Sequence, residues 1–194
     1  MLSAITNSSF GHLTFIPIKE QIMPTPCYIS IHGQTQGHIT AGAFTPDSVG
    51  NIYVEGHEDE MLVQEFKHVV TVPTDPQSGQ PSGQRAHKPF IFTVALNKAV
   101  PLMYNALASG EMLPSVELKW YRTSVEGKQE HFFTTALTDA TIVDINLRMP
   151  HAQDSTKAEF TQLMDVSLAY RKIDWEHNVA GTSGSDDWRT PVEA

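Results

Sequence analysis

The stretch Phe90-Ile91-Phe92-Thr93-Val94-Ala95-Leu96 decides the expected fold. Phe90, Phe92, Val94 and Leu96 occupy every second position, and smaller residues stand between them. A period of two residues is the pattern of a β-strand that buries one face, whereas an amphipathic helix repeats every three to four residues. We therefore predict a strand here, with its large apolar side chains in the core.

The same alternation continues downstream. It recurs in residues 116–121, and a further β-rich run, 129–137, follows the polar turn 124–128, so these two segments are predicted to form a hairpin. Residues 143–149 and 164–171 also alternate and are predicted to be two more strands.

Only one segment has helical spacing. Val100, Met103 and Leu107 recur at intervals of three and four residues, Pro101 stands near the start, and Gly110 follows the end. Many strands with a single short helix favour a mainly β fold, an antiparallel barrel or sandwich with the helix packed beside it.

The composition is that of one soluble, folded domain. The chain has 194 residues, 40% of them hydrophobic, which suits a single substantial core. Its formal net charge of -9 argues against binding to nucleic acid or anionic lipid. Cys27 is the only cysteine, so an intrachain disulfide cannot form. The apolar runs are too short to insert into a membrane.

The first 22 residues stand apart from this pattern. They contain neither a membrane-spanning stretch nor a conventional export signal, and Met23-Pro24-Thr25-Pro26 leads directly into an apolar run at Cys27. We expect residues 1–22 to be an N-terminal extension, disordered or upstream of a true start at Met23, and residues 23–194 to be the domain. The alternative is a genuine but mobile N-terminal arm.

No segment has the spacing of a known catalytic, metal or cofactor motif. His57-Glu58-Asp59-Glu60 lacks the spacing of a zinc or calcium site and is interpreted as a solvated acidic loop. His131, His151 and His177 are expected near strand ends, and Cys27 is expected to be a small buried or half-buried residue rather than a nucleophile. The prediction is no catalytic residue, no cofactor and no metal.

Two loops are unusually long. Residues 73–89 are rich in Pro, Gly, Ser and Gln and are predicted to be a solvated excursion. Residues 45–60 contain Ile52, Tyr53 and Val54, and apolar residues on a loop require a partner surface in the same chain or on a neighbour.

From residue 23 to residue 194 the sequence resembles the haemolysin-coregulated protein (Hcp) family, which forms the tube of the bacterial type VI secretion system. The segments that carry the resemblance are ITAGAF (39–44), GNIYVEGHEDE (50–60), VELKWYR (116–122), KQEHFFTT (128–135) and LAYRKIDWE (168–176).

The resemblance implies an antiparallel β-barrel of two sheets with one flanking α-helix. It also implies a hexameric ring that stacks into a tube, which a contractile sheath expels together with its spike protein into the medium or a target cell. Some rings carry effector proteins in their channel. The protein would wait in the bacterial cytoplasm and leave without a signal peptide, and none of these roles requires catalysis.

The resemblance further implies that one loop reaches the adjacent ring. The matching positions here are Val49, Gly50, Asn51, Ile52, Tyr53, Val54, Glu55, Gly56, His57 and Glu58. We expect the three apolar side chains to bury against a neighbouring subunit while the acidic end stays wetter.

Two other functions remain open on the residues alone. A small-ligand-binding β-barrel needs an internal cavity, and Phe90, Phe92, Trp120 and Phe133 argue instead for a filled interior. A metal-dependent hydrolase that uses the acidic loop and nearby histidines ranks last. A fused enzymatic domain is not expected, because only a short tail follows Trp175, which Trp188 is expected to dock.

Overall fold

The computed structural model describes residues 25–149, 151, 153 and 161–190. The expected extension 1–22 and the start at Met23 lie outside this part of the chain. The strands are β1 Cys27–Gly33, β2 Gly37–His38, β3 Met61–Lys67, β4 Val70–Thr71, β5 Ala86–His87, β6 Phe90–Ala95, β7 Met112–Thr123, β8 Gln129–Arg148, β9 Leu163–Ala169, β10 Lys172–His177 and β11 Thr182–Asp187. The helices are α1 Pro46–Val49, the 3-10 helix η1 Gly50–Ile52 and α2 Val100–Ser109.

The large sheet closes on itself. Its strands follow the order β11-β10-β8-β7-β1-β3-β6-β9, and β9 also pairs with β8, which makes a closed ring of β8, β7, β1, β3, β6 and β9. All of these pairings are antiparallel, and β4 with β5 forms a separate two-stranded sheet. The predicted antiparallel β-barrel is confirmed.

Closure depends on one long, bent strand. β8 pairs with β10 through residues up to Thr138 and with β9 from Thr141 onward, so its two halves serve different parts of the sheet. Asp139, at the change of partner, has a left-handed φ of 51°, and a bulge follows at Ile142/Asp144. Bulges bend and twist a strand. The two strands predicted over 129–137 and 143–149 are therefore one continuous strand, because these irregularities let it turn a corner.

The alternating residues of β6 supply the middle of the core. Phe90, Phe92 and Val94 are completely buried, whereas Leu96 lies beyond the end of the strand and is exposed. Trp120 packs against the core with part of its surface exposed. Phe133, expected in the interior, is only half-buried and lies against Phe132 and His177 instead.

Helix α2 lies alongside the barrel and contacts β8. Val100, Met103 and Ala106 form its buried stripe, and Gly110 ends it with a φ of 65° while its N–H bonds to the carbonyls of Ala106 and Leu107. Glycine adopts this left-handed conformation at little cost, which makes it a helix terminator. The predicted helix is confirmed, and α1 and η1 add single turns within the 45–60 loop.

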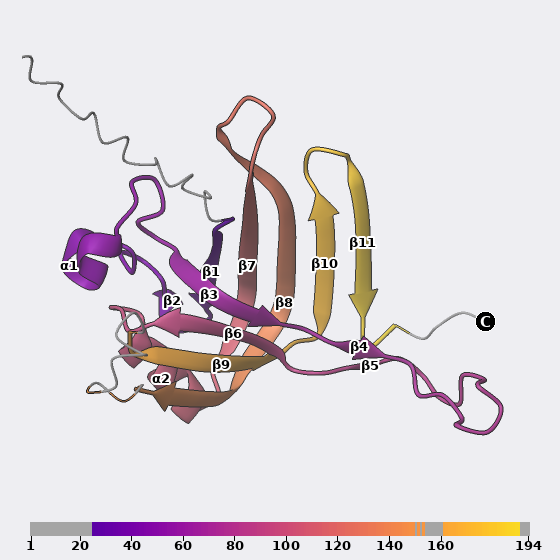
Figure 1. The fold of residues 1–194 in the computed structure, drawn as a ribbon. Coiled ribbons are helices and arrows are strands. Elements are labelled where there is room, and N and C mark those ends of the chain that lie inside the picture. The colour runs from indigo at the N-terminus through magenta and orange to yellow at the C-terminus, as the bar shows by residue number, and fades with distance from the viewer. Residues whose placement is uncertain (1–24, 150, 152, 154–160, 191–194) are drawn as a thin grey trace, which may run out of the picture.

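The segment after Trp175 is not a tail. Residues 182–187 form β11, which pairs with β10 in continuous register and extends the wall of β7, β8 and β10 (Figure 1). Beyond it the Trp188 N–H donates to the Arg171 carbonyl at 3.1 Å, and the Trp188 ring lies 5.2 Å from that of His87. Trp188 thus docks the end of the chain, as expected.

The long excursion is a ribbon. β4 and β5 pair at its base, Thr74 and Pro81 form an isolated bridge further out, and the ribbon projects away from the barrel (Figure 1). We call residues 68–88 the arm. It is solvated as predicted, except that His87 at its root is buried.

In the described part of the chain, no helix is both long enough and apolar enough to cross a bilayer.

Candidate assembly loop

The loop 49–58 begins at a short helix that is fastened to the barrel. Pro46 stands at the first turn of α1, a position that suits its fixed φ. Within α1 the Ser48 hydroxyl donates to the Ala43 carbonyl at 2.6 Å and accepts the N–H of Lys98 at 2.9 Å. Gly50, with a φ of 65°, then reverses the chain. The entrance of the loop is therefore fixed by polar contacts.

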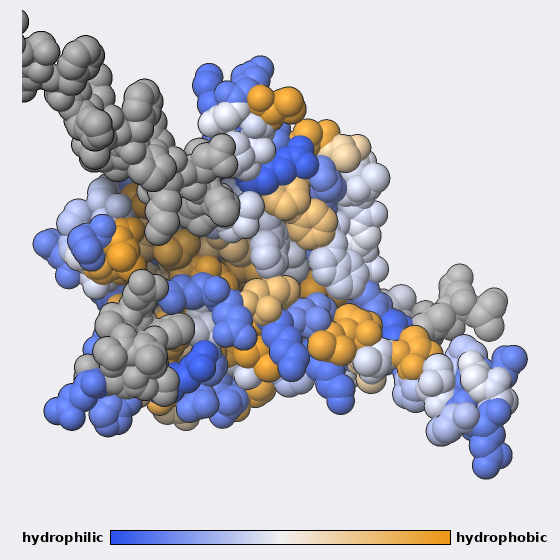
Figure 2. Space-filling view, viewed as in Figure 1, coloured by the Kyte–Doolittle hydropathy of each residue, from blue (hydrophilic) through white to orange (hydrophobic). Residues whose placement is uncertain are grey.

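Apolar side chains stand at the apex of this loop. Ile52 is 40% exposed and Val54 is 46% exposed, and Gly50, Asn51 and Glu55 beside them are also exposed. Apolar surface is visible beside α1 (Figure 2). A groove of about 400 Å³ adjoins the apex, lined by Ser48, Val49, Asn51, Ile52, Gln64, Leu96 and Thr161.

Tyr53 points the other way. Its hydroxyl donates to Glu58 Oε1 at 2.8 Å, and its ring lies 6.4 Å from that of Phe44. The hydrogen bond to Glu58 raises the pKa of the Tyr53 hydroxyl. Of the three apolar residues expected at the contact, Ile52 and Val54 are presented to solvent, while Tyr53 also braces the loop from within.

Glu58 organises the second turn of the loop. Its Oε1 accepts the Gly56 N–H at 3.0 Å as well as the Tyr53 hydroxyl, and its backbone carbonyl accepts the N–H of Phe44 at 3.0 Å. The hydrogen bond from the Gly56 backbone is the largest of the contacts that lower the pKa of Glu58. Gly56 has a φ of 96°, which a residue with a Cβ rarely adopts.

The acidic end is anchored rather than solvated, which corrects the interpretation of residues 57–60. Glu60 is only 8% exposed, and its carboxylate contacts His57 Nδ1 and Lys119 Nζ, each at 2.7 Å. The His57 ring stacks on Tyr28 with centroids 3.7 Å apart. Asp59 is exposed, but its Oδ1 accepts the Gly42 N–H. A buried carboxylate needs such partners. For Glu60 the positive charge comes from Lys119 on β7.

The protonation of neighbouring groups follows from this burial. Burial alone would lower the pKa of Lys119, but the hydrogen bond and charge of Glu60 outweigh it and the net shift is upward. Burial raises the pKa of Tyr28 and also that of the Cys27 thiol. Cys27 is thus a buried, inert residue, as predicted.

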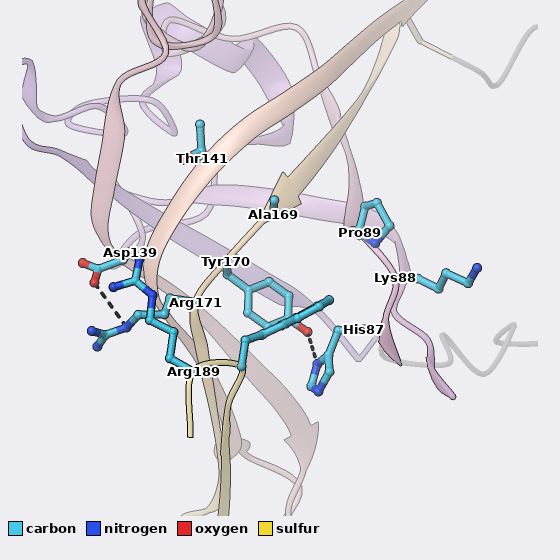
Figure 3. Close-up of a pocket in the computed structure, with 10 residues that line it drawn as sticks. His87, Lys88, Pro89, Asp139, Thr141, Ala169, Tyr170, Arg171 and Arg189 are labelled. Atoms are coloured by element: carbon cyan, nitrogen blue, oxygen red, sulfur yellow. Dashed lines mark hydrogen bonds and ion pairs between the residues drawn. The ribbon is translucent and has the colours of Figure 1, made fainter. Parts of the chain in front are cut away.

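A cavity of about 450 Å³ lies at the other end of the wall, where β8 bends and β10 begins, and sequence analysis did not anticipate it. Its lining is His87, Lys88, Pro89, Asp139, Thr141, Ala169, Tyr170, Arg171, Trp188 and Arg189. Asp139 faces Arg171 at 3.3 Å and Tyr170 faces His87, while Lys88 extends outward (Figure 3). The Arg171 Nε atom is buried, and its contact with Asp139 Oδ2 is an ion pair that lacks hydrogen-bond geometry.

The three histidines expected near strand ends lie in different parts of the chain, and elsewhere the rings of His32 and His38 stack with centroids 4.1 Å apart. His131 lies at the start of β8 and His177 at the end of β10, and His151 is exposed. The described residues contain no group of three or more His, Cys, Asp or Glu side chains arranged to hold a metal ion. The core cluster contains Phe90 and Phe92 inside the barrel, where a small-ligand-binding barrel would need space.

Comparison with known proteins points to a single family. Residues 28–177 match the family "Type VI secretion system effector, Hcp". The chain is 61% identical over 170 residues to the "Major exported protein" of Pseudomonas aeruginosa, covering 88% of this chain and 99% of that protein.

Similar solved structures belong to the same family. One titled "Crystal structure of Hcp protein" is 60% identical with a TM-score of 0.83, over 87% of this chain and all of that one. The "Secreted protein Hcp3 from Pseudomonas aeruginosa" is 53% identical with a TM-score of 0.74, over 86% of this chain and all of that one. The chain therefore belongs to the Hcp family of type VI secretion, a family of structural, secreted proteins and not of enzymes.

Proposed function

We propose that this protein is the structural subunit of a type VI secretion tube. Its copies form hexameric rings, and the rings stack into a tube that a contractile sheath expels with the spike. The tube carries effector proteins in its channel. The protein waits in the bacterial cytoplasm and is exported without a signal peptide. The family match and the 61% identity to an exported protein support this proposal.

The main support for ring stacking is the structure of loop 49–58. Ile52 and Val54 are exposed at its apex, yet the hydrogen bonds of Ser48, Glu58 and Glu60 hold the loop from both sides. An apolar side chain displayed on an ordered loop is a preorganised contact, since little conformational entropy is lost on binding. In an interface core with a polar rim, Ile52 and Val54 form the core and Glu55 the rim.

The two ends of the wall differ in a way that suits head-to-tail stacking. The β7–β8 hairpin ends in Val125, which is fully exposed, and Glu126. The opposite end, where β10 begins, carries the cavity with Lys88, Arg171 and Arg189 (Figure 1). Different surfaces at opposite ends are what a heterologous, repeating contact requires.

Electron microscopy of the purified full chain tests the proposal. Six-fold rings, and stacks of rings at high protein concentration, are expected. Particles that remain uniform monomers at every concentration and ionic strength would contradict it. Secretion is tested in the native host, where export of the protein should stop when the sheath is deleted and continue when an unrelated export system is deleted.

A further inference from the structure

Five polar side chains join the arm to the barrel beside the cavity at the start of β10. The Tyr170 hydroxyl lies 2.7 Å from His68 Nε2 and 2.6 Å from His87 Nδ1. On the far side, His87 Nε2 lies 2.7 Å from Asp186 Oδ2, which also accepts the Nε–H of Arg85. The chain of contacts runs from the arm through Tyr170 to β11 (Figure 3 shows its central pair).

This network is the main attachment of the arm. The His87 side chain is 1% exposed, and it is the one buried residue among positions 68–88. Arg85 Nη2 also donates to the Asp187 carbonyl at 2.9 Å, and within the arm the root contains two β4–β5 pairs and the hydrogen bond from the Lys88 N–H to the Val69 carbonyl at 2.9 Å. A two-stranded ribbon is at best marginally stable in water on its own. The position of the arm therefore depends on the two histidines together with Arg85.

Hydrogen-bond direction determines where protons can sit. Asp186 is ionised beside Arg85, so His87 must donate from Nε2, and a neutral His87 then accepts at Nδ1. Tyr170 has one hydroxyl proton, which it donates to His87 Nδ1, and its oxygen accepts the Nε2–H of His68. Each of these hydrogen bonds has one donor and one acceptor when both histidines are neutral.

One added proton can be accommodated. If it sits on His87 Nδ1, Tyr170 accepts there and turns its own proton to His68, which changes tautomer and accepts at Nε2. The imidazolium of His87 is then balanced by Asp186 at 2.7 Å. The two hydrogen bonds of the Tyr170 hydroxyl reverse direction, and neither is lost.

A second proton cannot be accommodated. With both rings charged, His68 and His87 each present a donor to Tyr170, whose hydroxyl proton has no acceptor in the network. The two cationic rings would also stand 6.2 Å apart next to the guanidinium of Arg85. We propose that this network is a pH-sensitive joint, which holds the arm while it contains at most one added proton and releases it when both histidines are protonated.

The surroundings determine the sign of the pH dependence. Burial, followed by the charge of His87, lowers the pKa of His68. The contact with Arg85 is the largest cause that lowers the pKa of Asp186, so this carboxylate stays ionised in the same range. The other charged groups around the pair, from every element packed there, are Lys88, Asp139, Arg171, Asp187 and Arg189.

A histidine whose pKa is lower in the closed state stabilises that state above its open-state value of about 6.5. This contribution is lost as the pH falls below that value. Uptake of one proton on opening changes the equilibrium about tenfold per pH unit.

Amide hydrogen exchange measured by NMR on the full chain between pH 7.5 and 5 tests the joint. The reporters are the amides of Lys88 and Trp188, which donate to Val69 and Arg171 at the root. After correction for intrinsic exchange, their opening should increase about tenfold per pH unit below about pH 6.5. In His68→Gln, which keeps a polar group but cannot be protonated, opening should not depend on pH. The matched control His131→Gln, outside the network, should respond as the wild type does.

Two results would overturn the proposal. One is an unchanged pH response in His68→Gln, and the other is parallel acceleration of the β6 amides, which would mean that the whole barrel unfolds. Tyr170→Phe is a second variant in case His68→Gln does not fold. It should loosen the root at neutral pH, because both histidines lose their hydroxyl partner, and a root that stays equally closed would contradict the role of the network. The reporters lie within one subunit, so this test does not depend on whether rings form.

Discussion

Replacing Ile52 and Val54 by Asp should abolish ring stacking while leaving the subunit folded. The two side chains are 40% and 46% exposed. Complete burial of an Ile or Val side chain contributes about 1.5–3 kcal/mol, so covering the remaining fraction contributes about 1 kcal/mol for each residue and about 2 kcal/mol for each loop. In the proposed hexamer, six loops together would contribute about 12 kcal/mol to each contact between rings.

Even a small part of this contact energy is enough to change ring stacking measurably. If only a quarter of it is realised, about 3 kcal/mol, stacking changes more than a hundredfold, since 1.4 kcal/mol corresponds to a factor of ten. Aspartate also places a carboxylate in the contact, which opposes burial unless it finds a partner. Because Ile52 and Val54 are outside the core cluster, the stability of the monomer should change little.

The assay is sedimentation of assembled material, with tube lengths measured by electron microscopy, on proteins shown to be folded by circular dichroism. Tyr104→Asp is the matched control, because Tyr104 is an exposed apolar residue on α2, away from the loop. The double variant should give single rings, and the control should give tubes. Tubes of wild-type length in the double variant would refute the assignment of stacking to the loop, while single rings in the control as well would show that any charge on this surface has the same effect.

Three further predictions concern the fold. Glu60→Gln should lower the free energy of unfolding by about 1–3 kcal/mol, measured in urea, because it weakens the contacts that pair Lys119 and His57 near the barrel; an unchanged midpoint would mean that the ion pair contributes nothing. Gly110→Ala should cost about 1 kcal/mol in thermal unfolding through its φ of 65° alone, since no atom lies within 4 Å of the added Cβ. Burial raises the pKa of the Cys27 thiol, so a maleimide should label the native protein far more slowly at pH 8 than the urea-unfolded protein, and equal rates would contradict its burial.

The predictable part of the fold is the part determined by local periodicity. The alternation in residues 90–95 places Phe90 and Phe92 in the core, and the spacing of Val100 and Met103 gives the helix. β11 was missed because Thr182–Asp187 contains no apolar residue, so nothing in it alternates. Its strand conformation comes from pairing with β10, a tertiary effect that overrides local preference.

The hydrogen bonds and ion pairs that hold loop 49–58 could not be predicted from its sequence. A run of acidic residues is ordinarily solvated, and the burial of Glu60 depends on Lys119, 59 positions away in the chain. The network at the arm joins His87 to Asp186 across 99 positions. Neither pairing leaves a local pattern, because a single polar residue has no period. Such networks become visible only when the topology brings their elements together.

The loop and the arm are held by the same physical means. Each projects from the barrel, and each is fastened by a carboxylate that contacts a histidine and a cation: the buried Glu60 with His57 and Lys119, and the partly buried Asp186 with His87 and Arg85. Polar anchoring leaves the apolar side chains of a projection free, since none is needed to hold it in place. In the loop these are Ile52 and Val54, which remain exposed on an ordered support. A subunit built in this way can present a preorganised apolar contact without depending on the partner to fold the segment that carries it.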